Sequence, residues 1–390
     1  MHLLEKYRRM LHDRGEWGEL ATFVPNKREP VYNWLYYKEG FSRELVFKLL
    51  ELFDAKKDQT VLDPFCGSGT VLLASKQLGL RAIGYDVLPI TLLASYAKTR
   101  NYDIEKLRKA AEILMKERFE KPVIREIPPI VKKAFSKYAL DDVLFFKEKI
   151  SSMEEDMQYF LLIALVRAAM MVSYAWKDGA VIKTRKKHSP PLRFMLQRTI
   201  SRMLKELEQI KLSQSEIIVE QCDARRMNLP ENSVDIIITS PPYLNNIDYT
   251  KVYAIENFIV SRARLVAKPA VRSQAQANAY IGLDEEYDYL VTDIEPLQLP
   301  QSAKPYFTDM NIVLEQMHRM CRRGAKVAII VGNGFVEEQI VDVDIMLAYL
   351  AEKLGFAVKN VFVLNKRFAL TNRTEKKGVL RESLIILEKR

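Results

Sequence analysis

Hydrophobic residues recur along this chain at two spacings, and each spacing predicts one kind of element. Short apolar runs predict buried strands at 60–64, 81–86, 216–219, 234–239 and 326–331. Apolar residues three and four positions apart predict helices over 42–53, over 70–78 and from Pro89 to about Lys98. Strands that alternate with helices are typical of a parallel sheet wrapped by helices. The pattern therefore predicts an α/β fold.

The alternation stops in the middle of the chain. Residues 101–212 show helical patterns at 103–118, 141–150, 153–175 and 191–211 without a convincing strand, and the proline-bearing stretch 121–130 indicates a linker. Further on, a helix over 343–354 and a closing hairpin of strands at 356–364 and 382–388 complete the pattern. We therefore predict one α/β domain, made of residues 1–100 and 213–390, that carries a helical insertion at 101–212.

Composition narrows the class of protein. The 390 residues are 48% hydrophobic, which predicts a sizeable core, and the net charge of +10 favours a polyanionic partner. The three cysteines lie far apart without metal-ligand spacing, so we expect no metal site and a reduced, cytoplasmic protein. The most apolar run, Leu161 to Val172, contains Arg167 and is shorter than the roughly 20 residues of a membrane span. We expect a buried helix there and no membrane association.

One peptide with candidate chemistry, Asp63-Pro64-Phe65-Cys66-Gly67-Ser68-Gly69-Thr70, directly follows the first predicted strand. Gly67 and Gly69 remove Cβ atoms where the backbone must turn tightly and approach a ligand. The next helix directs its first N–H groups at a carboxylate. Asp63, at the carboxyl end of its strand, is placed to accept a hydrogen bond from an ammonium group.

Two further carboxylates follow the next two predicted strands. Asp86 is placed to bind ribose hydroxyls, and Asp223-Ala224 to contact an adenine amino group. The third glycine of the dinucleotide fingerprint is absent, since Leu72 stands in its place, and the chain shows no phosphate-binding loop. NAD and ATP are therefore poor candidates. An amino acid joined to a nucleoside, as in S-adenosylmethionine, fits these side chains better.

A second peptide, Thr239-Ser240-Pro241-Pro242-Tyr243, follows the strand predicted at 234–239. An exocyclic amine on a base is a weak nucleophile because its lone pair is delocalised into the ring. The Ser240 hydroxyl and the Pro241 carbonyl are acceptors for its two N–H groups, and consecutive prolines keep the loop stiff. Tyr243 can stack on a base that has left the duplex. The peptide thus suits direct methyl transfer to an amine, although a rigid surface turn is the alternative.

Together the two peptides resemble the motifs of the DNA amino-methyltransferases, which methylate cytosine N4 or adenine N6. The stretch 33–42 resembles the upstream motif that completes the methionine pocket of that family. The resemblance implies a class I, Rossmann-like methyltransferase fold with a seven-stranded, mostly parallel sheet, and S-adenosyl-L-methionine as the cofactor. It implies cofactor contacts by Tyr37, Phe41, Ser42, Asp63, Pro64, Phe65, Cys66, Gly67, Gly69, Thr70, Asp86, Val87, Asp223 and Ala224. It implies a catalytic role for Ser240, Pro241, Pro242 and Tyr243.

The sequence defines the methylated base, and the choice between DNA and RNA as substrate, less sharply. Within the family, a serine at the position of Ser240 goes mostly with cytosine N4 and an aspartate with adenine N6, which favours cytosine. Adenine N6, guanine N2 of RNA and a non-catalytic DNA-binding protein stay open as alternatives. Cys66 lies inside the cofactor peptide, so we expect a packed side chain rather than the nucleophile of a C5 methyltransferase.

The insertion at 101–212 is the candidate target-recognition region, because the family places that region between its two motifs or after the second. Its basic end suits the phosphates of double-stranded DNA, unless it is a solvated helix face and loop. The expected nucleic-acid contacts are Lys183, Arg185, Lys186, Lys187, Arg193, Asn245, Asn246 and Tyr249. The stretch 244–306 is a second candidate, and Asn372, Arg373 and Arg381 give the closing hairpin a basic edge. A cognate restriction endonuclease is left open as a second partner.

Overall fold

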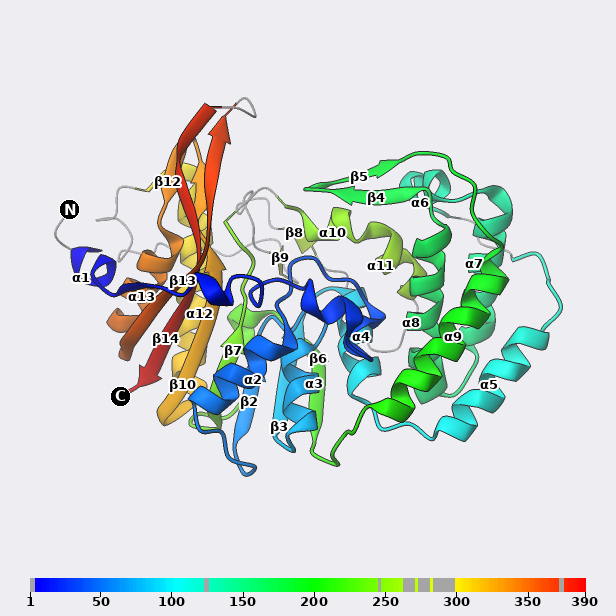
Figure 1. The fold of residues 1–390 in the computed structure, drawn as a ribbon, viewed down its shortest axis with the longest axis horizontal. Coiled ribbons are helices and arrows are strands. Elements are labelled where there is room, and N and C mark those ends of the chain that lie inside the picture. The colour runs from blue at the N-terminus through cyan, green and yellow to red at the C-terminus, as the bar shows by residue number, and fades with distance from the viewer. Residues whose placement is uncertain are drawn as a thin grey trace.

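A mostly parallel sheet forms the centre of the protein (Figure 1). The computed structural model describes residues 4–122, 126–244, 247–261, 271–272, 281–282, 299–371 and 375–390. The eight strands of the central sheet lie in the order β1-β13-β14-β10-β7-β2-β3-β6. The antiparallel strand is β14, which pairs with β10 on one side and β13 on the other, while the remaining neighbours are parallel.

The strands of this sheet are β1 (Leu11–Asp13), β2 (Thr60–Asp63), β3 (Arg81–Asp86), β6 (Ile217–Gln221), β7 (Val234–Thr239), β10 (Cys321–Gly332), β13 (Phe356–Thr371) and β14 (Glu375–Lys389). Three two-stranded ribbons accompany it: β4 (Ala175–Asp178) with β5 (Val181–Thr184), β8 (Val271–Arg272) with β9 (Ile281–Gly282), and β11 (Gly334–Val336) with β12 (Gln339–Val341).

Helices cover both faces of the sheet, which explains why its strands read as continuous apolar runs. Ile236 and Ile238 of β7 pack on the side of α2 (Arg43–Leu52) and α3 (Thr70–Gln77). Ile237, between them, packs on the side of α12 (Lys304–Met320) and α13 (Val343–Lys353). The short α1 (Glu5–Arg8) lies against α13.

A helical half packs beside the β6 side of the sheet (Figure 1). It consists of α5 (Ile104–Lys116), α6 (Pro129–Ala134), α7 (Lys137–Ser151), α8 (Glu155–Val172), α9 (Leu192–Gln209), α10 (Tyr249–Val252) and α11 (Ala254–Val260). Helix α8 is buried over most of its length, as its apolar sequence predicts. One apolar core joins this half to α4 (Pro89–Thr99) and to the segment around Trp34. In the described ranges, no helix is both long and apolar enough to cross a membrane.

The predicted fold class is confirmed, with some differences in the elements. The sheet has one strand more than the seven predicted, because the short β1 joins the edge beside β13. The ribbon β4–β5 lies where we expected no strand, and its half-exposed residues lack the apolar run of a buried strand. Helix α12 was not predicted, and α6 begins at Pro129, inside the expected linker.

Candidate active site

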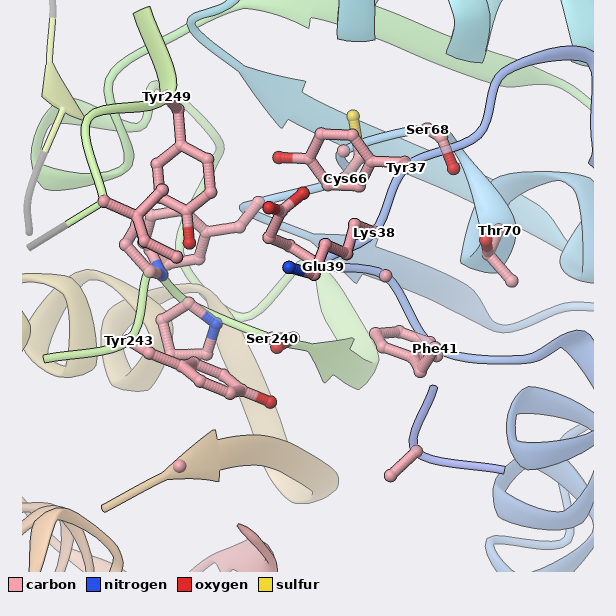
Figure 2. Close-up of a pocket in the computed structure, with 18 of the residues that line it drawn as sticks. Tyr37, Lys38, Glu39, Phe41, Cys66, Ser68, Thr70, Ser240, Tyr243 and Tyr249 are labelled. Carbon is pink, nitrogen blue, oxygen red and sulfur yellow. The ribbon is translucent and has the colours of Figure 1, made fainter. Parts of the chain in front are cut away.

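The two motif peptides meet in one pocket of about 340 Å³ at the carboxyl ends of β2, β3 and β7 (Figure 2). Strands β2 and β7 are parallel neighbours, with Val61 opposite Ile236, so the loops that follow them share one edge of the sheet. The pocket is lined by parts of 37–41, 63–70, 86–88, 222–224, 240–243, 365–367 and 380–382. Ligands of open α/β sheets bind at this edge.

Asp63 lies at the base of the pocket and is buried. Its Oδ1 accepts hydrogen bonds from the Thr239 hydroxyl at 2.7 Å and from the Phe65 N–H at 3.1 Å. Burial raises the pKa of Asp63 to about 7, although both hydrogen bonds oppose the shift. The carboxyl therefore changes its charge near neutral pH.

Asp86 ties the glycine loop to the end of β3. Its Oδ2 accepts the Gly67 N–H at 2.9 Å, while its Oδ1 accepts the N–H groups of Val87 at 2.8 Å and Leu88 at 2.9 Å. The Thr91 hydroxyl donates to the same Oδ1 at 2.7 Å. Burial raises the pKa of Asp86, and these hydrogen bonds oppose that shift.

The ring of Tyr37 also lies against the glycine loop, at Gly67. Gly67 has a φ of +51°, and a Cβ added there would lie 2.9 Å from Cε1 of Tyr37, so this position needs glycine for both space and conformation. The Tyr37 ring stacks on Tyr253 with 5.2 Å between the centroids. Gly69, with a φ of +77°, directly precedes α3 as its N-cap residue and lies against Ser95 rather than in the pocket lining.

Ser68 presents an unsatisfied polar atom beside this loop. Its side chain is buried, and its Oγ has no hydrogen-bond partner within the described part of the chain. Ser68, like Thr70 at the first turn of α3, belongs to the pocket lining. A buried hydroxyl without a partner costs free energy, so the position favours a ligand that supplies the missing hydrogen bond.

The remaining residues expected at the cofactor have different surroundings. Phe41, Pro64, Phe65, Cys66, Val87 and Ala224 line the pocket. Ser42 instead caps α2 by accepting the Leu45 N–H at 3.2 Å. Both carboxylate oxygens of Asp223 bind the buried Arg225, at 3.0 Å from Nε and 2.7 Å from Nη2. Burial raises the pKa of the Cys66 thiol, which makes it a poor nucleophile.

The Ser240–Tyr243 peptide forms the opposite side of the pocket (Figure 2). The Tyr243 hydroxyl donates to Glu382 Oε1 at 2.8 Å, and the ring lies against Gly332, where an added Cβ would be 2.8 Å from Cδ2. Burial raises the pKa of Tyr243, so its phenol stays neutral. Gly332, the last residue of β10, therefore lies beside the pocket.

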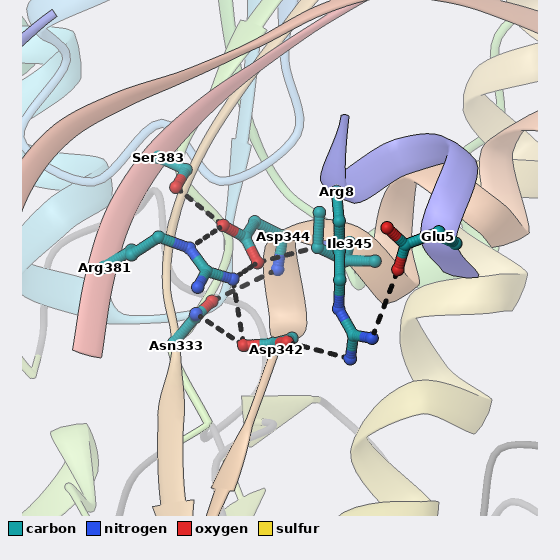
Figure 3. A network of polar contacts seen from close by, with 8 residues as sticks. All are labelled: Glu5, Arg8, Asn333, Asp342, Asp344, Ile345, Arg381 and Ser383. Atoms are coloured by element: carbon teal, nitrogen blue, oxygen red, sulfur yellow. Dashed lines mark hydrogen bonds and ion pairs between the residues drawn. The ribbon is translucent and has the colours of Figure 1, made fainter. Parts of the chain in front are cut away.

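A polar network next to Glu382 in sequence fixes β14 against α13 (Figure 3). Arg381 donates to Asp344 at 3.0 Å from Nε, and its Nη2 lies 2.9 Å from Asp342 Oδ1. The Ser383 hydroxyl donates to Asp344 Oδ2 at 2.7 Å, and Asn333 joins the same group. Arg381 and Ser383 are the neighbours of Glu382 in β14, and both are held by Asp344. The carboxylate that accepts the Tyr243 hydrogen bond therefore lies on a fixed strand.

The residues expected to contact nucleic acid differ in their exposure and in their distance from the pocket. Tyr249 is buried and lines the pocket. Lys183, Arg185, Lys186 and Lys187 are exposed on or directly after β5 and do not line it. Arg193 is half-buried and donates to the carbonyls of Met115 at 2.7 Å and Glu117 at 3.0 Å, so it caps α5. Asn245 and Asn246 lie outside the described residues, as do Asn372 and Arg373.

Comparison with known proteins adds family information. A family model described as DNA methylase, of the N6/N4 type, matches residues 14–90. The chain is 29% identical to the type II methyltransferase M.BsoBI of Geobacillus stearothermophilus, over 95% of this chain and 88% of that protein. It is 24% identical to the type II methyltransferase M.AvaI of Nostoc sp., over 89% and 83%. These matches support the DNA amino-methyltransferase family.

Among solved structures, the chain is similar to TrmN from Thermus thermophilus, with 15% identity and a TM-score of 0.32. The match covers 89% of this chain and 49% of the TrmN chain.

The amino-methyltransferase family implies S-adenosyl-L-methionine as the cofactor. The pocket fits that molecule because it combines a buried carboxyl at Asp63, an unpaired hydroxyl at Ser68 and the N-terminus of α3. In the described ranges, no group of three His, Cys, Asp or Glu side chains is placed to hold a metal ion.

Sequence reasoning missed several residues of the pocket wall. Glu382, Arg367 and Lys366 come from the closing hairpin, and Cys222 and Leu88 from the loops after β6 and β3. Nothing near Glu382 in the sequence marks it, because its partner Tyr243 lies 139 positions away. The signal for Leu88 was its place two residues after Asp86.

Proposed function

We propose that this protein is a type II DNA methyltransferase that transfers a methyl group from S-adenosylmethionine to the exocyclic N4 of cytosine. The observation that carries this proposal is the single pocket that holds the Asp63–Thr70 loop on one side and Ser240–Tyr243 on the other. Two relatives named type II methyltransferases align with most of this chain, which supports DNA as the substrate.

On the cofactor side, the pocket offers partners for the ammonium, carboxylate and ribose groups of the ligand. The bound cofactor supplies an electrophilic methyl group on a sulfonium sulfur. The Asp63 carboxylate accepts a hydrogen bond from its ammonium group, and the Ser68 hydroxyl with the first N–H groups of α3 binds its carboxylate. Asp86, which already holds the Gly67 loop and lines the pocket, would accept hydrogen bonds from the ribose hydroxyls. Tyr37 covers the loop from the other side.

On the substrate side, the target base leaves the duplex and enters beside Tyr243. The Ser240 hydroxyl and the Pro241 carbonyl accept hydrogen bonds from the two amine N–H groups, which turns the nitrogen lone pair toward the methyl group. Pro241 and Pro242 keep both acceptors in place. The Tyr243 ring, held by Glu382, provides a flat surface for the base.

Ser240 is the feature that favours cytosine over adenine, through the family pattern stated above. For the polymer, we propose that Lys183 and Arg185–Lys187 contact DNA phosphates and that residues 101–212 take part in target recognition. A cytoplasmic location and a partner restriction endonuclease are further parts of this proposal.

Mass spectrometry of nucleosides tests the proposed reaction. Unmethylated DNA is incubated with the purified protein and S-adenosylmethionine, then digested to nucleosides. We expect N4-methylcytosine from the native protein and none from the Asp63→Ala variant, which controls for methyltransferases of the expression host. N6-methyladenine would overturn the choice of base. The absence of any methylated base would overturn DNA as the substrate and bring RNA forward.

A further inference from the structure

The closing hairpin extends beyond the sheet to which it belongs (Figure 1). The ladder between β14 and β10 runs from Glu388 to Glu382 and ends there, at Gly332 of β10. Beyond that point, residues 366–371 of β13 pair with 375–381 of β14. We call these two stretches the distal arm.

One face of the distal arm is packed. Ala369 and Leu380 are buried, and Gly378 lies directly against Ile340 of β12, so that an added Cβ would overlap that side chain. This contact holds the arm against the ribbon β11–β12 and makes it a fixed projection of the fold.

The other face exposes large apolar side chains. Phe368 and Val379 are opposite each other in the ladder and are 54% and 42% exposed, and Leu370 on the same face is 47% exposed. Single exposed apolar residues are ordinary, but three neighbours on one fixed face indicate a surface that contacts a partner.

The charge around these side chains indicates what the partner is. The arm carries Lys366, Arg367, Lys376, Lys377 and Arg381, and Glu375 is its one carboxylate. Lys366 pairs with Asp13, Lys377 with Glu375, and Arg381 with Asp342 and Asp344. Lys376 instead lies 4.2 Å from the Phe368 ring centroid. Within the described ranges, neither Arg367 nor Lys376 has a carboxylate within 4.0 Å. Lys376 lies beside the exposed apolar face, and Arg367, opposite Leu380, extends from the other face of the arm. Cations on both sides of a ribbon fit phosphates that flank sugars and bases.

The end of the arm nearest the central sheet forms part of the candidate active site. Lys366, Arg367 and Leu380 line the pocket, and Glu382, next along β14, holds Tyr243. A duplex that delivers a base to Tyr243 must therefore pass close to the arm. A two-stranded ribbon is also narrow enough to enter the major groove of B-form DNA.

We propose that the distal arm binds duplex DNA beside the target base, with Arg367 and Lys376 on phosphates and the apolar face of Phe368, Leu370 and Val379 in a groove. This inference rests on the proposed function and adds a DNA-contacting element on the sheet side of the pocket. The ribbon β4–β5, which the other basic residues follow, belongs to the helical half and not to the sheet side that carries the arm (Figure 1).

Binding measurements on matched variants test the arm. The probe is a short duplex that carries the position methylated by the native protein. Phe368→Ala and Lys376→Ala are compared with Leu52→Ala and Lys57→Ala, an exposed apolar residue and an exposed lysine near the amino end of β2. We expect each arm variant to weaken DNA binding about tenfold, and Lys376→Ala to lower the slope of log Kd against log salt by about 0.9. The control variants should bind as the native protein does.

The outcomes separate this inference from the proposed function. Calorimetry with S-adenosylmethionine checks that every variant keeps its cofactor affinity and hence its fold. If the native protein methylates DNA and the arm variants bind DNA as tightly as it does, the arm has no such role. If the native protein neither binds nor methylates DNA, the proposed function fails, and the partner proposed for the arm fails with it.

Discussion

At the scale of single residues, the protonation of Asp63 controls the charge at the base of the pocket. Burial raises its pKa to about 7, so the carboxylate forms as the pH rises through neutrality. An ammonium group binds the carboxylate and not the neutral acid. We therefore expect S-adenosylmethionine affinity, measured by calorimetry, to rise between about pH 6 and pH 8. For the protein alone the sign is reversed: the stability that Asp63 contributes is present at low pH and is lost as the pH rises through 7.

Two variants identify Asp63 as the group that titrates. Asp63→Asn cannot ionise, so it should bind the cofactor weakly with no change across this range. In the native protein, the hydrogen bond from the Thr239 hydroxyl to Asp63 Oδ1 lowers the pKa of Asp63. Thr239→Val removes that hydrogen bond, so the midpoint of the rise in cofactor affinity should move to higher pH. A native protein whose affinity is independent of pH would show that Asp63 does not contact the ammonium group.

Tyr243 and Glu382 permit a second test at this scale. Tyr243→Phe keeps the ring but loses the hydrogen bond to Glu382, and a hydrogen bond to a charged group is worth about 1.5–3 kcal/mol. We expect kcat to fall roughly tenfold in Tyr243→Phe and further in Tyr243→Ala, because stacking adds about 1–3 kcal/mol. Steady-state kinetics measure the loss, and calorimetry should show unchanged cofactor affinity.

Glu382→Gln is the control for that hydrogen bond, since an amide oxygen at this position still accepts from the Tyr243 hydroxyl. It should keep most of the native kcat. If Tyr243→Ala turns over at the native rate, the ring does not hold the base.

At the scale of elements, the loop between β2 and α3 depends on Gly67. Alanine there would have to adopt a φ of +51° and place its Cβ 2.9 Å from the Tyr37 ring. Gly67→Ala should therefore weaken cofactor binding more than tenfold, by moving either the loop or Tyr37. Gly79→Ala is the matched control, because its φ of +77° is also left-handed but its nearest neighbour is Lys57 at 3.9 Å.

Comparison of Gly67→Ala with Gly79→Ala separates the effect of a left-handed backbone from the effect of the contact with Tyr37. Gly79→Ala should lower the free energy of unfolding by about 1–2 kcal/mol, the cost of a left-handed residue with a Cβ, and leave cofactor affinity unchanged. Urea denaturation measures the first quantity and calorimetry the second. Equal cofactor affinity in both variants would show that Tyr37 does not close the loop.

The strands around this loop were predictable because burial on both faces makes them continuous apolar runs. Helix α12 was missed although Phe307, Met310 and Leu314 recur at helical spacing, so the signal was present. The ribbon β4–β5 has no such signal, because its side chains are exposed or half-exposed. Glu382 and the contact of Tyr37 with Gly67 depend on residues far apart in sequence, and only the folded chain brings them together.

At the scale of the whole molecule, the helical half and the sheet half share one core. Trp34, which precedes the pocket residue Tyr37, packs on Phe160 of α8 with 5.6 Å between ring centroids. Arg167 of the same helix donates to the Asn33 carbonyl at 2.9 Å. The insertion predicted at 101–212 is thus continuous with the packing that places the cofactor side of the pocket, and we expect both halves to unfold together.

Glu206 of α9 is the polar centre of that junction and gives the last prediction. Its buried carboxylate accepts the Trp34 indole N–H at 2.9 Å and the Val31 N–H at 3.1 Å. Glu206→Ala leaves these buried donors unpaired and should lower the free energy of unfolding by roughly 3–5 kcal/mol. Glu208 lies on the same helix as Glu206 and forms an exposed ion pair with Arg108 of α5, so Glu208→Ala should cost less than about 1 kcal/mol. Urea denaturation followed by tryptophan fluorescence and by circular dichroism should give one coincident transition, and two separate transitions would contradict the shared core.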